Sequence, residues 1–85
     1  MIMTIDQIIK LQTSDDYKER MIAEYQLLKR RFEKLKKMVD DYFHGKLNFT
    51  LDCPIALFDM QLEVMAKYLD ILVIRAKIEG VNLDG

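Results

Sequence analysis

The sequence has few of the residues that build disulfide frameworks, metal centres or frequent turns. It contains one cysteine, Cys53, one histidine, His44, and no tryptophan. Neither a disulfide framework, a metal cluster nor a cofactor site is therefore expected, and a lone thiol suits a reducing cytoplasm. Because turn-forming residues are confined to the middle and the end of the chain, the segments between them are expected to be long. These turn-forming residues are Pro54, Gly45, Gly80 and Gly85.

An excess of charge of one sign and a long apolar run are also missing. The formal net charge is −1, so no global field attracts anionic lipid or nucleic acid, and nucleic acid is disfavoured as a partner. No apolar run approaches the roughly 20 residues of a membrane span, and residues 1–12 lack the pattern of a signal peptide. The chain does contain 51% hydrophobic and 32% charged residues, which excludes an ordinary disordered chain. We expect one cytoplasmic domain, residues 1–85, whose own core is marginal.

The pattern of apolar residues predicts an all-α fold. A short helix is expected over 4–12, where Thr4 and Gln7 fit a capping box, and it is too short to be stable unless it docks on something. A long helix is expected over 15–43, because its apolar residues recur at alternating spacings of three and four, as in a coiled-coil seam. The residues of this seam are Met21, Tyr25, Leu28, Phe32, Leu35, Val39 and Tyr42.

A connection over 44–52 is expected to lead into a second long helix over 53–79. Pro54 is tolerated in the first turn of this helix, and Gly80 is expected to end it. The tail beyond, residues 82–85, is expected to be frayed. The predicted N-caps of the two long helices are Thr13 or Ser14 for the first, and Asp52 or Cys53 for the second.

The helix expected over 53–79 is apolar around more than half of its circumference. One stripe consists of Phe58, Leu62, Met65, Leu69, Leu72 and Ala76, and a second consists of Leu57, Gln61, Val64, Tyr68, Ile71, Arg75 and Ile78. The narrow seam of the other long helix can cover only one stripe, and the short helix can cover part of the other. The rest needs further cover, which we expect from another copy of the chain. The sequence therefore predicts a long antiparallel helical hairpin with a short N-terminal helix, assembled as a homo-oligomer.

No group of residues indicates catalysis. The acidic pairs at 15–16 and 40–41 are expected at helix ends or on solvated faces, so a general acid is not indicated. Cys53 and His44 lie nine residues apart, without a third group that would make a nucleophile of the thiol. We predict no catalytic residue and no enzyme activity.

The most informative local feature is a run of basic residues between Lys29 and Lys37, opposed only by Glu33. Bases spread around a helix usually form its solvated face. Tyr25 and Lys29, however, are i,i+4 neighbours, so a ring and an ammonium share one edge of the helix. A nucleotide could stack its base on the ring and place its phosphate at the cation. No recognition-helix motif, zinc finger or glycine-rich phosphate loop accompanies the run.

Several short features along the chain occur together in one known group of proteins. The first long segment carries an aromatic, an aliphatic and a basic residue, Tyr25, Leu28 and Lys29. The Cys53–Pro54 step opens the second long segment, which contains Met65. The pattern at the end of that segment consists of Arg75, Ala76, Glu79, Gly80 and Val81. Over residues 17–81 the pattern resembles the hairpin domain of phage cyclic-nucleotide sponges that disarm the CBASS and Thoeris defence systems. Related small, uncharacterised phage proteins share this domain.

The resemblance implies a protein that sequesters a cyclic or ADP-ribose-derived signalling nucleotide without cleaving it, in the cytoplasm of an infected bacterial cell. It also implies homo-oligomers with pockets between protomers, in which Lys29 meets a phosphate and Tyr25 forms part of the wall. Arg31, on the other side of the seam, competes with Lys29 as the anion contact. The ligand-binding residues that we predict are Lys29, Tyr25, Arg30, Tyr17, Arg20 and Tyr68.

Other functions stay open at this point. The main alternative is a protein-binding or structural hairpin, either a phage inhibitor of a host protein or a small assembly factor. Small dimeric helical enzymes such as chorismate mutases have a similar size, but their first helix normally carries an arginine that residues 5–12 lack. The basic run also keeps nucleic-acid binding as a minor alternative.

Overall fold

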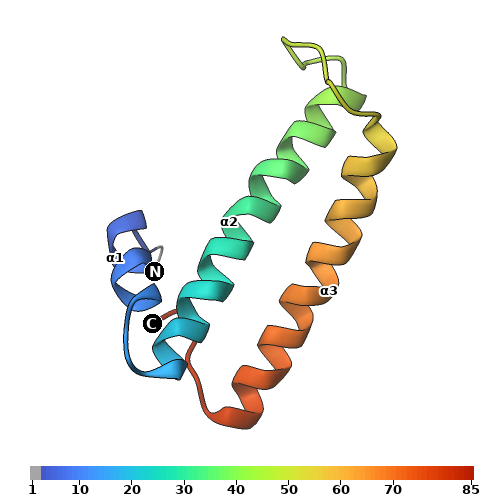
Figure 1. Ribbon diagram of the computed structural model, residues 1–85. Coiled ribbons are helices and arrows are strands. Elements are labelled where there is room, and N and C mark those ends of the chain that lie inside the picture. Colours follow the sequence, from blue (N-terminus) through green and yellow to red (C-terminus); the bar gives the residue numbers. More distant parts are fainter. Residues whose placement is uncertain (1–2) are drawn as a thin grey trace.

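The computed structural model describes residues 3–85, and over these residues it contains three helices and no strand. They are α1 (Ile5–Gln12), α2 (Tyr17–Phe43) and α3 (Ile55–Glu79). The two long helices run side by side in opposite directions and form a hairpin (Figure 1). The short α1 lies against the first half of α2, on the side away from α3 (Figure 1). The predicted all-α fold is confirmed.

The start of α1 is fixed by its predicted capping box. The Gln7 amide donates to the Thr4 hydroxyl at 3.2 Å, and the Thr4 amide donates to the Gln7 side-chain oxygen at 2.9 Å. Both bonds satisfy amides that a helix start leaves without partners. Met3 and Ile8 are then buried together against Ala23 of α2. The small side chain of Ala23 lets the short helix dock closely, which provides the contact that a helix of this length requires.

The predicted N-cap of α2 is wrong by two or three residues. Asp16 caps the helix, and its carboxylate accepts from the Lys18 amide at 2.9 Å. Thr13 is not available for this role, because its amide and hydroxyl both donate back to the Ile9 carbonyl at the end of α1. The Ser14 hydroxyl instead accepts from the Asp16 amide at 3.1 Å and so shapes the turn between the helices.

The predicted N-cap of α3 is also wrong. Pro54 occupies the cap position with φ −58° and ψ 140°, and no side chain caps the helix. The carbonyl of Pro54 accepts from the Leu57 amide at 3.1 Å, which closes the first turn. Asp52 and Cys53 stand too early in the chain for the local bond that a cap side chain makes to the second or third helical amide. The Cys53 thiol is free and exposed.

The end of α3 and the tail that follows pack onto the hairpin. Gly80 adopts the left-handed conformation with φ 70°, and the Val81 amide donates to the Ala76 carbonyl at 2.8 Å. This is the expected glycine C-cap. The tail is not frayed as predicted, because the side-chain amide of Gln26 donates to the Leu83 carbonyl at 2.7 Å. Gln26 is buried, and a buried amide requires such a partner.

The hydrogen bond between Gln26 and Leu83 gives a testable prediction. Replacing Gln26 with alanine should cost about 0.5–1.5 kcal/mol in stability, the usual net value of such a bond. It should also release the tail, so NMR contacts between the Leu83 methyl groups and the cluster of Met21, Leu72 and Ala76 should weaken. The same substitution at the exposed Gln12 is the control. An unchanged set of Leu83 contacts in the Gln26 variant would show that apolar packing alone holds the tail.

The hairpin core forms between the predicted seam of α2 and the first stripe of α3. Met21, Leu72 and Ala76 are buried together, and Tyr25 and Leu28 pack against them. The predicted seam thus faces α3 from Met21 to Leu28, whereas Tyr42, its last predicted residue, is exposed.

The expectation that the short helix covers part of the second stripe is wrong. Within residues 3–85, α1 contacts α2 but not α3. Its buried residue, Ile8, is already used against Ala23, on the face of α2 that points away from α3. The second stripe of α3 consequently lies open along the outside of the hairpin.

Candidate functional site

Lys29 and Tyr25 share one edge of α2, as their spacing predicts. The Lys29 ammonium lies 6.0 Å from the centre of the Tyr25 ring, and both side chains are half-buried. Packing against the cluster of Met21, Leu72 and Ala76 holds the ring in place. A cation beside an anchored ring can bind an anion that carries a planar group, since partial burial reduces the screening of the charge by water.

The two predicted arginines bind backbone carbonyls. Arg30 donates to the Met3 carbonyl at 3.3 Å and so links α2 to the segment before α1. Arg20 donates to the Ser14 carbonyl at 2.7 Å, in the turn between α1 and α2. A guanidinium has five N–H donors, so each arginine retains donors for a ligand. The two arginines nevertheless lie in different places. Arg30 reaches the segment before α1, whereas Arg20 reaches the turn after α1.

Tyr17 is exposed and belongs to a polar cluster at the foot of the hairpin. The pKa of the Tyr17 phenol is raised, mainly by its hydrogen bond to the Glu79 carboxylate. Desolvation and the negative charge of Glu79 raise this pKa further. Glu79 also pairs with Arg75, whose Nε lies 3.3 Å from the carboxylate. A phenol held in its neutral form can donate a hydrogen bond, but Tyr17 lies about two turns along α2 from Tyr25, beside the end of α3.

Two of the predicted residues, Arg20 and Tyr68, line one hollow of about 240 Å³ that α2 and α3 form with the end of α1. Leu28 and Arg31 line it as well. Arg31 is the residue that competes with Lys29 for the predicted role of anion contact. It lies about 200° from Lys29 around α2, since each residue turns a helix by about 100°.

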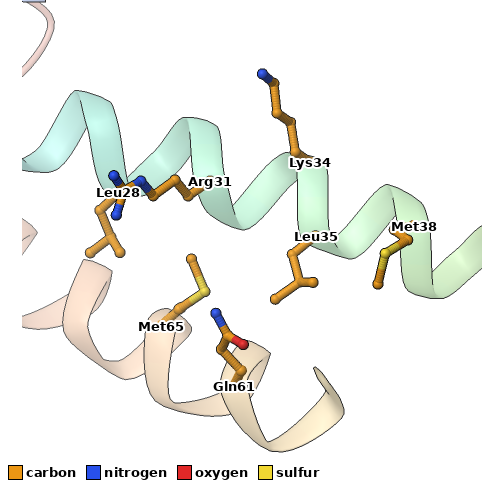
Figure 2. Close-up of a pocket in the computed structure, with 7 residues that line it drawn as sticks. All are labelled: Leu28, Arg31, Lys34, Leu35, Met38, Gln61 and Met65. Carbon is orange, nitrogen blue, oxygen red and sulfur yellow. The ribbon is translucent and has the colours of Figure 1, made fainter. Parts of the chain in front are cut away.

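A larger hollow of about 550 Å³ adjoins the first and shares Leu28 and Arg31 with it. Figure 2 shows Leu28 and Leu35 reaching from α2 toward Met65 of α3, whereas Lys34 points away from α3. The floor is thus apolar, and the charges stand at the rim. The residues that line it are Leu28, Arg31, Lys34, Leu35, Met38, Gln61 and Met65.

The larger hollow was not predicted from the sequence. Gln61 carried a weak signal, because it is a polar residue within the otherwise apolar second stripe of α3. The methionines carried a weaker one, since methionine at helical spacing usually fills a core. Only the packing of the two helices shows that their side chains leave a space beside Arg31.

One copy of the chain does not gather the six predicted residues. Lys29 and Tyr25 lie on one side of the hairpin, Arg20 and Tyr68 on the other, Arg30 toward α1 and Tyr17 at the foot. Among residues 3–85, no three His, Cys, Asp or Glu side chains are grouped to hold a metal ion. In the same part of the chain, no helix is long and apolar enough to cross a membrane.

Comparison with known proteins identifies the family of this hairpin. The family model of Sequestin matches residues 15–78, which span α2 and nearly all of α3 and leave α1 outside. No curated protein and no solved structure is significantly similar to the chain. The match confirms the resemblance to phage nucleotide sponges, and it indicates sequestration of a signalling molecule rather than catalysis. The chain belongs to the Sequestin family.

Proposed function

We propose that this protein binds and sequesters a cyclic or ADP-ribose-derived signalling nucleotide without cleaving it. It would act as a phage immune-evasion protein against CBASS or Thoeris, in the cytoplasm of an infected bacterial cell. The observation that carries the proposal is the Sequestin match across the hairpin. The Lys29–Tyr25 edge supports it, because a phosphate and a base need a cation and an aromatic surface close together.

The nucleotide is proposed to lie between copies of the chain. The predicted residues are divided between two sides of the hairpin, so one copy offers Lys29 and Tyr25 where another could offer Arg20 and Tyr68. A pocket closed by two copies would exclude more water than either surface alone. A charged hydrogen bond to phosphate would then be stronger than at an open surface.

The hollow beside Arg31 is the competing location for the same ligand. Its volume of about 550 Å³ falls within the range of roughly 300–1,000 Å³ that small-molecule sites occupy. An arginine guanidinium can also bind a phosphate through two parallel hydrogen bonds. Lys34 adds a second cation at the rim.

A protein-binding hairpin is the alternative function. The exposed apolar residues along α3 favour it, because large exposed apolar surfaces commonly mark contacts with other proteins. The partner would be a host protein or a component of an assembly.

A nucleotide panel tests the proposed function. The purified protein would be mixed with cyclic dinucleotides, cyclic trinucleotides and cyclic ADP-ribose isomers, and its melting temperature measured. A ligand at 100 times its dissociation constant stabilises by about 2.7 kcal/mol. For a domain of this size the melting temperature should rise by roughly 10–20 °C.

Recovery of the ligand separates sequestration from catalysis. Mass spectrometry of the supernatant after heat denaturation should return the intact nucleotide. A cleaved product would contradict the absence of enzyme activity, and a panel that leaves the melting temperature unchanged would favour the protein-binding alternative.

A further inference from the structure

The outer face of α3 carries a second heptad seam. Its residues follow spacings of three and four over 22 residues, about 33 Å of helix. Six of the seven are aliphatic or methionine, and each is more than half exposed, from 52% at Leu57 to 80% at Ile78. A single charged residue, Lys67, interrupts them at the middle. The seam consists of Leu57, Met60, Val64, Lys67, Ile71, Ile74 and Ile78.

Nothing in the described part of the chain covers this face. The inner stripe of α3 already packs on α2, and α1 packs on the opposite side of α2. A strict heptad pattern of apolar residues is the signature of a helix that packs along another helix with the same repeat. The α3 helix of a second copy carries that repeat. Contact between two identical faces gives a closed dimer, with each residue pairing reciprocally.

We infer that two copies pack along this outer face of α3 in antiparallel orientation. Lys67 decides the orientation. In a parallel pair each seam residue meets its own counterpart, so two Lys67 ammonium groups would share one core layer. In an antiparallel pair Lys67 meets an aliphatic residue, and its long stem can lie along the seam while the ammonium reaches water. Two like charges in one layer disfavour the parallel arrangement.

The flanking charges and the number of paired layers together favour one antiparallel register. When Met60 pairs with Ile78 of the second copy, Lys67 pairs with Ile71 and Val64 with Ile74. Glu63 then lies opposite Lys77 of the second copy, which forms two attractive pairs across the dimer, while Asp70 faces its own counterpart at the dimer axis. A shift by one heptad in one direction would place Glu63 opposite Asp70 in both halves of the dimer, with no attractive pair to offset them. A shift in the other direction would pair Asp70 with Lys77, but it would leave only four of the six seam layers paired. Opposite charges at these flanking positions set partner and orientation in coiled coils.

This dimer also bears on the hollows. Gln61 and Tyr68, which line them, lie at the edge of the seam. In the selected register the two Tyr68 rings meet near the dimer axis, and Arg75 of the second copy comes opposite Gln61. A second copy would thus add an aromatic ring and a cation beside the hollows. The dimer itself requires no ligand, so its test is independent of the proposed nucleotide binding.

Site-directed cross-linking distinguishes the two orientations. In a Cys53→Ser background, Met60→Cys and Ile78→Cys variants would carry tags of different size and be treated with a short bis-maleimide. The antiparallel register predicts a cross-link when the two variants are mixed, and little when either is alone. Efficient cross-linking of Ile78→Cys with itself would overturn the orientation. Absence of cross-links in every mixture would overturn the seam as a contact between copies and leave a partner protein as its occupant.

Charge substitutions give a second test, read by sedimentation equilibrium with circular dichroism as the check of folding. Ile74→Glu places a carboxylate opposite Val64 and should weaken association by roughly tenfold or more. Ile71→Glu places it opposite Lys67 of the second copy and should weaken association less. Lys36→Glu, on an exposed part of α2, is the control. A larger loss for Ile71→Glu than for Ile74→Glu, or a monomeric wild type, would contradict the register.

Discussion

Replacing Leu72 with alanine is expected to lower the free energy of unfolding by about 3–5 kcal/mol. Leu72 is fully buried, with 0% of its surface exposed, in the cluster where the end of α3 packs on the start of α2. Met21 and Ala76 are buried beside it, and Tyr25 and Leu28 pack against this cluster. Alanine would remove the transfer energy of the lost carbons and leave a cavity that two long helices cannot easily close.

The size of this effect matters because the chain is small. A domain of this length is stable by only about 5–10 kcal/mol, so the variant should be close to unfolding at room temperature. Urea titration followed by circular dichroism measures the loss. Ile9→Ala is the matched control, since Ile9 is 51% exposed on α1 and should cost less than about 1 kcal/mol. A loss below about 1 kcal/mol for Leu72→Ala would show that the hairpin packs in a different register.

The hairpin could be predicted because its signal is periodic and long. The α2 seam and the inner stripe of α3 each repeat over many residues, and tertiary packing follows that repeat. The caps were harder, because each depends on competition among neighbours. Thr13 has the side chain of an N-cap for α2, yet it bonds back to α1. The tail was missed because its partner, Gln26, lies more than 50 residues away in sequence.

The candidate site was predictable only where it is local. Tyr25 and Lys29 are neighbours on any helix, because side chains four residues apart lie on the same face. The distribution of the other residues depends on tertiary structure. Arg20 and Tyr68 come together in one hollow only because α3 lies against α2, and Arg30 is drawn to the Met3 carbonyl only because the N-terminal segment docks there.

Replacing Lys29 with alanine is expected to leave folding intact and to weaken nucleotide binding by about 1.5–3 kcal/mol. The side chain is half-buried and is not part of the two buried core clusters, so its removal should change stability little. The loss in affinity reflects a hydrogen bond between an ammonium and a phosphate. Isothermal titration calorimetry with the nucleotide found in the panel measures it. In terms of the dissociation constant, the loss corresponds to a factor of roughly 10–150.

The matched comparison is between Lys29→Ala, Arg31→Ala and Lys36→Ala. Lys36 lies two turns from Lys29 on nearly the same side of α2 and is exposed, so it reports the general effect of removing one positive charge. That effect should be screened by salt, because exposed charges act weakly beyond about 10 Å at 0.1 M ionic strength.

A large loss for Lys29→Ala alone places the phosphate at the Lys29–Tyr25 edge. A large loss for Arg31→Ala alone places the ligand in the hollow with Met38 and Met65 and contradicts the role given to Lys29. Since the two residues lie on opposite sides of one helix, a single ligand on one copy cannot contact both. Equal losses for both variants would therefore require a second copy, with each side of the hairpin facing the same nucleotide from a different protomer.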